Sequence, residues 1–318
     1  MWYRSRVGQK CATWHHGYRH LQKAAPCRNL LQFPRRLFGS DESNLLPLTL
    51  FFSDVHLGRE PEGDRERLAT ILACVRYELN GRGNSLPDNG AEQPSIIFLG
   101  DTFDAFVDTP RRMPPIAHAW MDLVKELRNL GAAVRFFSGN HDRWHAGNLE
   151  RHAGIRPDRG PAYLPHPRAK VLVSHGDEAD HLPPHERFIK WLSDTRAAHA
   201  AYRTVLPFGA AQRVAAWASA RLATVGPGDA RATASHEQTV NALRRSAMGY
   251  LEKKRAQVVV YGHAHRAELT AMHDGLYLNT GDWYLSRTYG VLAGTHARLV
   301  RWKAGEPSPD TLAEHVLF

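Results

Sequence analysis

The sequence has 318 residues, of which 43% are hydrophobic and 23% are charged. These proportions are ordinary for a soluble globular protein, and a chain of this length can bury a full core, so we do not expect a largely disordered protein. No apolar run reaches about 18 residues, so we expect no transmembrane segment. The three cysteines form no Cys-x-x-Cys pair, which argues against a disulfide framework and a thiolate metal site and suits a reducing compartment.

The net charge of +9 is concentrated at the start of the chain. Residues 1–40 contain eight Lys and Arg residues and no Asp or Glu, so the rest of the chain is close to neutral. Proteins that bind the phosphate backbone of nucleic acids usually carry their positive charge on the folded domain. We therefore expect no nucleic-acid partner.

We expect a basic, disordered extension over residues 1–45 and a folded domain over residues 46–318. The extension is rich in Arg and His and has no compact apolar segment, so a secretory signal is not expected. Three interpretations stay open: an organellar transit peptide, a disordered tail, and a start codon placed too far upstream. Composition alone is weak support for a transit peptide, so it favours the last two.

Strands and helices alternate along the first part of this domain. Short apolar runs, typical of strands buried on both faces, are found at Leu46–Ser53, Ser95–Leu99, Ala132–Ser138, Lys170–Ser174 and Gln257–Tyr261. Between them, Arg65–Leu79 and Ile116–Leu130 carry apolar residues at helical spacing, and Gly131 can end the second helix. This alternation predicts an α/β fold.

The alternation is interrupted from about residue 183 to residue 255. This stretch is rich in Ala and Arg and mostly helical in pattern, with breaks at Pro207, Gly209 and residues 226–229, and we interpret it as a helical insertion. After His265 the pattern returns to strands, and Asp274-Gly275 is a hairpin signal. One domain with an insertion and two separate domains both fit this length.

Each of the five predicted strands is followed by residues of the types that bind metal ions. The clusters are Asp54-Val-His56, Gly100-Asp101-Thr-Phe-Asp104, Gly139-Asn140-His141-Asp142, His175-Gly176-Asp177 and Gly262-His263-Ala-His265. In open α/β sheets ligands bind beyond the carboxyl ends of the strands, so five such clusters can converge on one place. Any one cluster could be a turn or a helix cap, but five after five strands favour a shared site.

The spacing and chemistry of these clusters predict a metal centre. In a strand, residues i and i+2 point to the same side, so an Asp-x-His or His-x-His pair can reach one ion, and the glycines let the backbone pass close to the site. Carboxylate, imidazole and amide oxygen ligands suit Mn²⁺, Fe²⁺ or Zn²⁺. Two ions about 3.5–4 Å apart would bind a bridging hydroxide and clamp a phosphoryl group during in-line displacement. Asp101, mid-sheet and directly after a glycine, is the expected bridging carboxylate.

The order DxH, GDxxD, GNHD, H and GHxH resembles the calcineurin-like metallophosphoesterases, and all five blocks are present between Asp54 and His265. The resemblance implies a four-layer β-sandwich flanked by helices, with a helical insertion as a lid. It implies one ion bound by Asp54, His56, Asp101 and His265, and a second bound by Asp101, Asn140, His175 and His263. It also implies that His141 stabilises or protonates the leaving oxygen, with Asp142 orienting His141.

Within that family the chain is most similar to the UDP-2,3-diacylglucosamine hydrolases of lipid A synthesis. The likeness rests on the insertion after His175-Gly176-Asp177, on the return of the chain at 258–263, and on the LNTGDWY segment at 278–284. It implies hydrolysis of a nucleotide-sugar lipid at the α-phosphorus to give UMP, by a cytoplasmic enzyme that contacts the inner membrane through its insertion. The transit-peptide interpretation would imply import into an organelle instead.

Two features leave the substrate open. The best-known hydrolases of that group have Arg where this chain has His141, and only a His can act as a general acid near neutral pH. Apolar residues of the insertion could line a groove for acyl chains, although packing of the insertion onto the domain is the expected role for most of them. These residues are Phe188, Trp191, Leu192, Val214 and Trp217.

Other functions are compatible with the same site. A phosphomonoester, a cyclic nucleotide or a small phosphodiester could be the substrate, whereas the near-neutral body disfavours a nuclease. A non-enzymatic scaffold on this fold would be expected to have lost metal ligands, and none is missing here.

Overall fold

The computed structural model describes residues 47–81, 93–109, 111–180, 230–303, 306 and 308–317, together with positions 195, 209–210 and 213. The basic extension and most of the predicted insertion lie outside these residues. The same holds for the five apolar residues of the insertion, namely Phe188, Trp191, Leu192, Val214 and Trp217. None of the described helices is long and apolar enough to cross a membrane.

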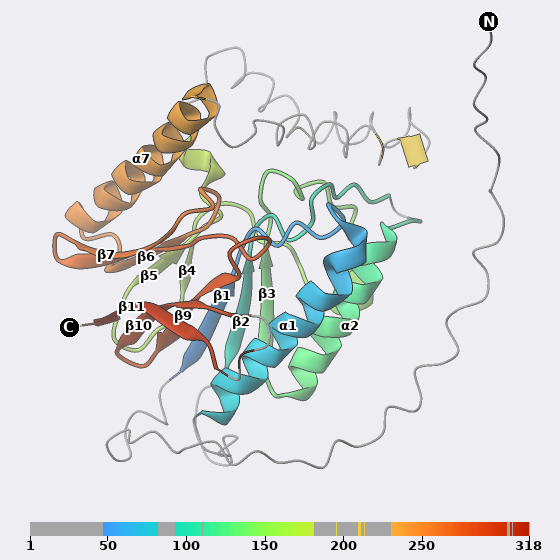
Figure 1. Ribbon diagram of the computed structural model, residues 1–318, viewed down its shortest axis with the longest axis horizontal. Helices are drawn as coiled ribbons and strands as arrows, with labels where there is room; N and C mark the ends of the chain where they lie inside the picture. The colour runs from blue at the N-terminus through green and yellow to red at the C-terminus, as the bar shows by residue number, and fades with distance from the viewer. Residues whose placement is uncertain are drawn as a thin grey trace, which may run out of the picture. The chain divides into compact units, whose positions relative to one another are not determined.

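One sheet has six strands in the order β11-β10-β9-β1-β2-β3 (Figure 1). Its first half is parallel, with β1 next to β2 and β2 next to β3, and its second half is antiparallel. The strands are β1 (Leu48–Phe52), β2 (Ser95–Leu99), β3 (Ala133–Phe137), β9 (Thr288–Ala293), β10 (His296–Arg301) and β11 (Asp310–Val316). The three parallel strands confirm the first three predicted apolar runs.

The other sheet has five strands in the order β4-β5-β6-β8-β7. Its three central strands are parallel and its two outer strands are antiparallel. The strands are β4 (Ala162–Leu164), β5 (Val171–Val173), β6 (Val258–Tyr261), β7 (Ala267–Met272) and β8 (Gly275–Thr280). The predicted hairpin is confirmed, because Gly275 begins β8 and pairs with Met272 at the end of β7.

The described helices are α1 (Pro61–Asn80), α2 (Pro115–Asn129), α3 (Asn148–Ala153), α7 (Ala230–Glu252) and the short 3₁₀ helix η2 (Asp177–Ala179). Helix α1 begins four residues before its predicted start, with Pro61 at the first position and Glu62 and Asp64 in the first turn. Proline and acidic residues favour a helix start, but this turn carries no apolar residue at helical spacing. Helix α7 occupies part of the predicted insertion.

The alternation of side chains in the strands divides the core into three parts, and the protein into four layers. Leu50 and Phe52 of β1 face α1 and α2, where they pack with Trp120. Phe51 points the opposite way and packs against Val260 of the other sheet. The far face of that sheet packs against α7, in a cluster that contains Val259 and Leu243. Figure 1 shows α1 and α2 on one side and α7 on the other.

This order of helix, sheet, sheet and helix confirms the expected four-layer architecture. The five predicted strands are divided between two sheets packed face to face, three in one sheet and two in the other. The apolar runs are continuous because helices cover the outer face of each sheet and the other sheet covers its inner face.

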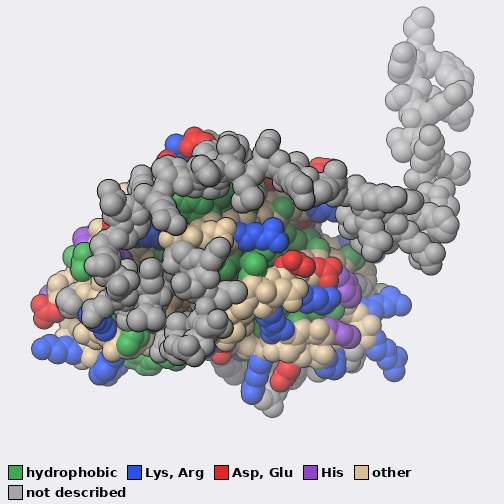
Figure 2. Space-filling view, turned by 90° about the horizontal axis from the view of Figure 1, so that it is seen from below, with side chains coloured by type: hydrophobic (Ala, Val, Ile, Leu, Met, Phe, Trp, Pro, Cys, Tyr) green, Lys and Arg blue, Asp and Glu red, His purple; other side chains and the backbone are tan. Residues whose placement is uncertain are grey.

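Charged side chains are mixed on the face that Figure 2 shows. Lys and Arg side chains are spread among acidic and hydrophobic ones, so the coloured part of this face carries no single basic patch.

Candidate metal centre

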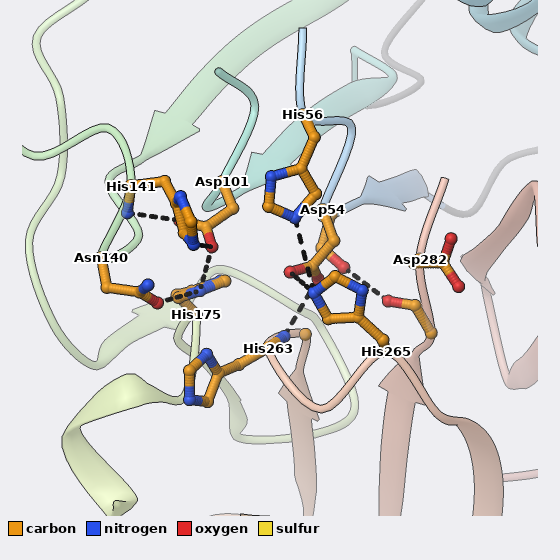
Figure 3. A network of polar contacts seen from close by, with 12 residues as sticks. Asp54, His56, Asp101, Asn140, His141, His175, His263, His265 and Asp282 are labelled. Atoms are coloured by element: carbon orange, nitrogen blue, oxygen red, sulfur yellow. Dashed lines mark hydrogen bonds and ion pairs between the residues drawn. The ribbon is translucent and has the colours of Figure 1, made fainter. Parts of the chain in front are cut away.

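The loops that follow β1, β2, β3, β5 and β6 meet at one edge of the two sheets and bring the predicted ligands together (Figure 3). Backbone hydrogen bonds join these loops, since the N–H of Asp54 donates to the Gly100 carbonyl at 3.1 Å and that of Gly262 to the His175 carbonyl at 3.0 Å. A third bond crosses between the sheets, from the N–H of His263 to Asp54 Oδ2 at 3.0 Å. The convergence expected from the sequence is therefore present.

Five of the seven predicted ligands have a left-handed backbone conformation. Their φ angles are 53° at Asp54, 49° at His56, 49° at Asp101, 66° at His263 and 51° at His265. Residues with a Cβ rarely adopt this conformation, which costs about 1–3 kcal/mol each and is concentrated at functional sites. The described part of the chain has three other non-glycine residues of this kind, so the strain is concentrated at this centre.

These φ angles show that the Asp-x-His and His-x-His pairs do not lie in extended strands, contrary to the expectation from their spacing. Strand β1 ends at Phe52, before Asp54 and His56, and β6 ends at Tyr261, before His263 and His265. The paired ligands converge because left-handed residues turn the chain, and the alternation of an extended strand is not what places them.

The expected close approach of the backbone is present at the glycines. A Cβ at Gly139 would lie 2.6 Å from the backbone nitrogen of Asp101 and would overlap its carboxylate. A Cβ at Gly100, where φ is 85°, would overlap the ring of His175. Only glycine can occupy these positions without moving a predicted ligand.

One half of the centre contains Asp54, His56 and His265, whose ligand atoms all lie within 4.8 Å of one another. The Nε2 atoms of His56 and His265 face each other at 3.4 Å, and His265 Nε2 lies 3.2 Å from Asp54 Oδ1. Burial acts to raise the pKa of Asp54, but His265 beside it lowers this pKa below its usual range. Burial lowers the pKa of His265, and Asp54 raises it above its ordinary value.

The other half contains Asp101, Asn140 and His175. His175 Nε2 lies 3.4 Å from Asp101 Oδ2 and 3.2 Å from Asn140 Oδ1, while its Nδ1 donates to the Leu99 carbonyl at 3.0 Å. That bond leaves Nε2 as the nitrogen that can bind a metal ion. Burial acts against protonation of His175, yet the Asp101 carboxylate raises its pKa well above the ordinary value.

Asp101 lies between the two halves. Its carboxylate, the carboxylate of Asp54 and the imidazole of His175 have ligand atoms within 4.8 Å of one another. Figure 3 shows Asp101 between His141 and His175 on one side and His56 on the other. It is fully buried by the surrounding loops, which favours the neutral acid, but His175 lowers its pKa well below the usual range. This position supports the expectation of a shared, bridging ligand.

His263 lies beside the second half, with its ring centre 5.0 Å from that of His175. Its Nε2 is directed at Asp180 Oδ2, at 2.9 Å. Asp180 had no role in the sequence-based prediction.

His141 also faces the centre. Its backbone N–H donates to Asp101 Oδ1 at 2.9 Å, its Nδ1 donates to the Asp104 carbonyl at 2.8 Å, and its Nε2 lies 3.8 Å from Asp101 Oδ2. The ring therefore presents Nε2 to the side of the centre where the two halves meet.

Asp142 has other partners than the expected His141 ring. Its buried carboxylate accepts hydrogen bonds from the N–H groups of Gly139, at 2.7 Å, and Phe103, at 3.2 Å. The side chain is turned into its own loop, so it shapes the backbone around Asn140, and the Asp104 carbonyl orients His141 in its place. Burial, and then the nearby Asp101, raise the pKa of Asp142 to about 7.

Sequence reasoning quoted Asp104 within the GDxxD block but gave it no role. Its Oδ1 lies 3.2 Å from His56 Nδ1 and accepts a hydrogen bond from Arg59 at 2.6 Å. A carboxylate on Nδ1 directs the Nε2 atom of His56 to the centre, the usual outer arrangement at metal-binding histidines. The LNTGDWY segment supports the other side, where the N–H of Tyr284 donates to the Asp54 carbonyl at 3.1 Å.

The residues present fit divalent metal ions. Imidazole nitrogens and carboxylate oxygens converge here to within 4.8 Å of one another, from a strained backbone. Such groups, with outer partners on their remaining atoms, are typical of a metal centre. Carboxylate, imidazole and amide ligands without thiolate match Mn²⁺, Fe²⁺ or Zn²⁺.

Comparison with known proteins agrees with this chemistry. The chain is 28% identical over 132 residues to a UDP-2,3-diacylglucosamine hydrolase of Porphyromonas gingivalis, a match that covers 40% of this chain and 45% of the relative. It is 29% identical over 131 residues to a protein of the same name from Aeromonas salmonicida, covering 41% of this chain and 45% of the relative. The chain thus aligns with less than half of the length of these curated relatives.

Solved structures of low identity are also similar. Vacuolar Protein Sorting 29 of Cryptosporidium parvum has 14% identity and a TM-score of 0.40, over 86% of this chain and 99% of that one. The phosphoesterase YfcE of E. coli has 15% identity and a TM-score of 0.37, over 85% of this chain and all of that one. Both scores are low, so the assignment rests on the sequence match to a family model, Calcineurin-like phosphoesterase, over residues 48–267. The chain belongs to the calcineurin-like phosphoesterase family.

Proposed function

We propose that the protein is a phosphoesterase that binds two divalent metal ions, with Mn²⁺ as the first choice. The observation that carries this proposal is the position of Asp101, which is buried between an Asp54–His56–His265 group and an Asn140–His175 group. A carboxylate shared between two sets of ligands can hold two ions about 3.5–4 Å apart, the separation found in two-metal sites.

The ligands divide as the family resemblance implies. Asp54, His56 and His265 would hold one ion with Asp101, and Asn140, His175 and His263 would hold the other with the same carboxylate. When bound, such ions polarise a phosphoryl oxygen and activate a water molecule for in-line displacement at phosphorus. Asp104 and Leu99 orient the rings of His56 and His175 through their Nδ1 atoms.

His141 is the proposed general acid. The Asp104 carbonyl accepts its Nδ1–H, so Nε2 is the nitrogen that can donate a proton or a hydrogen bond to the leaving oxygen. Its backbone N–H, bonded to Asp101, fixes the ring close to the centre.

A nucleotide-sugar lipid is the proposed substrate, hydrolysed as by a UDP-2,3-diacylglucosamine pyrophosphatase. Two observations support this choice: two relatives have that name, and this chain contains the LNTGDWY segment. Such a substrate would bring the protein to a membrane surface. His141 favours the alternative of another small phosphomonoester or phosphodiester, because a general acid is most useful for leaving groups of high pKa.

The activity is tested with purified protein, Mn²⁺ and a bis-aryl phosphodiester. We expect hydrolysis that requires the metal and is abolished by Asp101→Ala, because both ions lose a ligand. Asp122→Ala is the matched control, since this exposed carboxylate on α2 pairs only with Lys125 among the described residues. Full activity of the Asp101→Ala protein would contradict the site.

The same preparation tests the substrate. Release of UMP from UDP-2,3-diacylglucosamine at a higher kcat/KM than from simpler phosphoesters would support the lipid substrate. Turnover of the simpler esters without UMP release would refute it and leave the phosphoesterase proposal standing.

A further inference from the structure

Asp180 contacts His263 from the end of the loop that begins with His175. Its Oδ2 lies 2.9 Å from His263 Nε2, and its side chain retains only 18% exposure. Its other oxygen, Oδ1, is buried and has no hydrogen-bond partner among the described residues. Within that part of the chain, His263 is the hydrogen-bonding partner of the carboxylate.

We infer that Asp180 is a positioning residue that fixes the tautomer and orientation of His263 for metal binding through Nδ1. By accepting the Nε2–H, the carboxylate leaves the lone pair on Nδ1, the ring nitrogen nearer the backbone. This inference rests on the proposed two-metal function, in which His263 is a ligand of the second ion.

Three other histidines of the centre, His56, His141 and His175, are held in the opposite sense. Nδ1 donates to a backbone carbonyl in both His175 and His141, and Nδ1 of His56 faces the Asp104 carboxylate, so each of these rings presents Nε2. In His263, Nε2 is the nitrogen that is held. Without Asp180 the ring would lose the contact that distinguishes its two nitrogens, and it could turn away from His175.

A purely structural role explains less of the geometry. The neighbouring Asp177 carboxylate pairs with Arg143 and joins the loop to the Asn140 loop, whereas among the described residues Asp180 pairs with His263 and with no Lys or Arg side chain. A mostly buried carboxylate that is hydrogen-bonded to one imidazole matches the carboxylate–histidine–metal arrangement, in which loss of the outer carboxylate typically weakens metal affinity about 10–100-fold.

The test is a Mn²⁺ titration of the full-length protein, in which binding is measured by calorimetry and by electron paramagnetic resonance. We expect wild type to bind two ions, and Asp180→Ala to bind one of them about 10–100-fold more weakly. Asp180→Asn keeps an acceptor oxygen and the side-chain shape, so it should recover part of the affinity and should fold. Glu178→Ala, an exposed carboxylate on η2, is the control and should bind both ions as wild type does.

A double-mutant cycle separates positioning from a general effect on the fold. In the His263→Ala background, Asp180→Ala should cause no further loss of affinity. Unchanged affinities in Asp180→Ala, or an equal further loss without His263, would overturn the inference while the phosphoesterase proposal stands. Fewer than two ions in the wild-type protein would overturn both.

Discussion

The charges of Asp101, His175 and His265 explain why metal binding at this centre should depend on pH. In the metal-free protein the carboxylates of Asp101 and Asp54 raise the pKa of His175 well above its ordinary value of 6.5 and raise that of His265. The protons on these rings occupy the nitrogens that a metal ion needs, so binding must release them. His56 differs, because burial lowers its pKa and leaves it neutral.

We therefore predict that the affinity for Mn²⁺ rises with pH. Below the raised pKa values of His175 and His265, each displaced proton adds up to about a tenfold gain in affinity per pH unit, and the gain ends once both rings are neutral. Titration calorimetry from pH 6.5 upward, in two buffers of different ionisation enthalpy, measures both the affinity and the number of protons released. An affinity that does not change over this range would contradict the assignment of these histidines.

The convergence of the candidate ligands could be predicted, but their conformations and outer partners could not. Ligand types after five apolar runs predicted that these loops would meet, because residue type and order appear directly in the sequence. The left-handed φ angles of Asp54 and His56 carry no such signal, since nothing local favours them. The partners of His56 and His263 come from loops distant in sequence, so Asp104 and Asp180 were found only in the structure.

At the level of elements, buried strands were the best-predicted features. Strands β2 and β6 coincide with their apolar runs to within one residue, because burial on both faces leaves no polar position to blur the pattern. Strands β10 and β11 were anticipated only as a return to strands. In β10 buried residues are mixed with more exposed ones, and β11, at a sheet edge, has no buried residue. The apolar pattern of α1 omits its polar first turn.

Gly139, in the loop after β3, and Gly249, in α7, give opposite predictions for substitution by alanine. A Cβ at Gly139 would overlap Asp101, so Gly139→Ala should move that carboxylate and strongly weaken both metal binding and hydrolysis. Gly249, in α7, has nothing within 4 Å of an added Cβ, so Gly249→Ala should stabilise the protein by about 0.5–1 kcal/mol. Thermal unfolding and Mn²⁺ titration of both variants test this contrast. A Gly139→Ala protein with wild-type metal affinity would show that the loop tolerates a side chain.

At the scale of the whole molecule, the two sheets explain why ligands so distant in sequence meet. Loops from the β1–β2–β3 half of one sheet supply Asp54, His56, Asp101 and Asn140, and loops from β5 and β6 of the other supply His175, His263 and His265. The centre therefore exists only when the sheets are packed together. Strand–helix alternation could not predict this division, because it reveals the order of strands in the chain and not the sheet that each one joins.

The central claim is that two metal ions share Asp101 at the meeting point of these sheets. The most direct measurement is anomalous diffraction from crystals of the Mn²⁺-loaded protein. We predict two anomalous peaks about 3.5–4 Å apart, on either side of the Asp101 carboxylate, with His56 and His265 next to one and His175 and His263 next to the other. A single peak, or peaks that do not contact Asp101, would contradict the account.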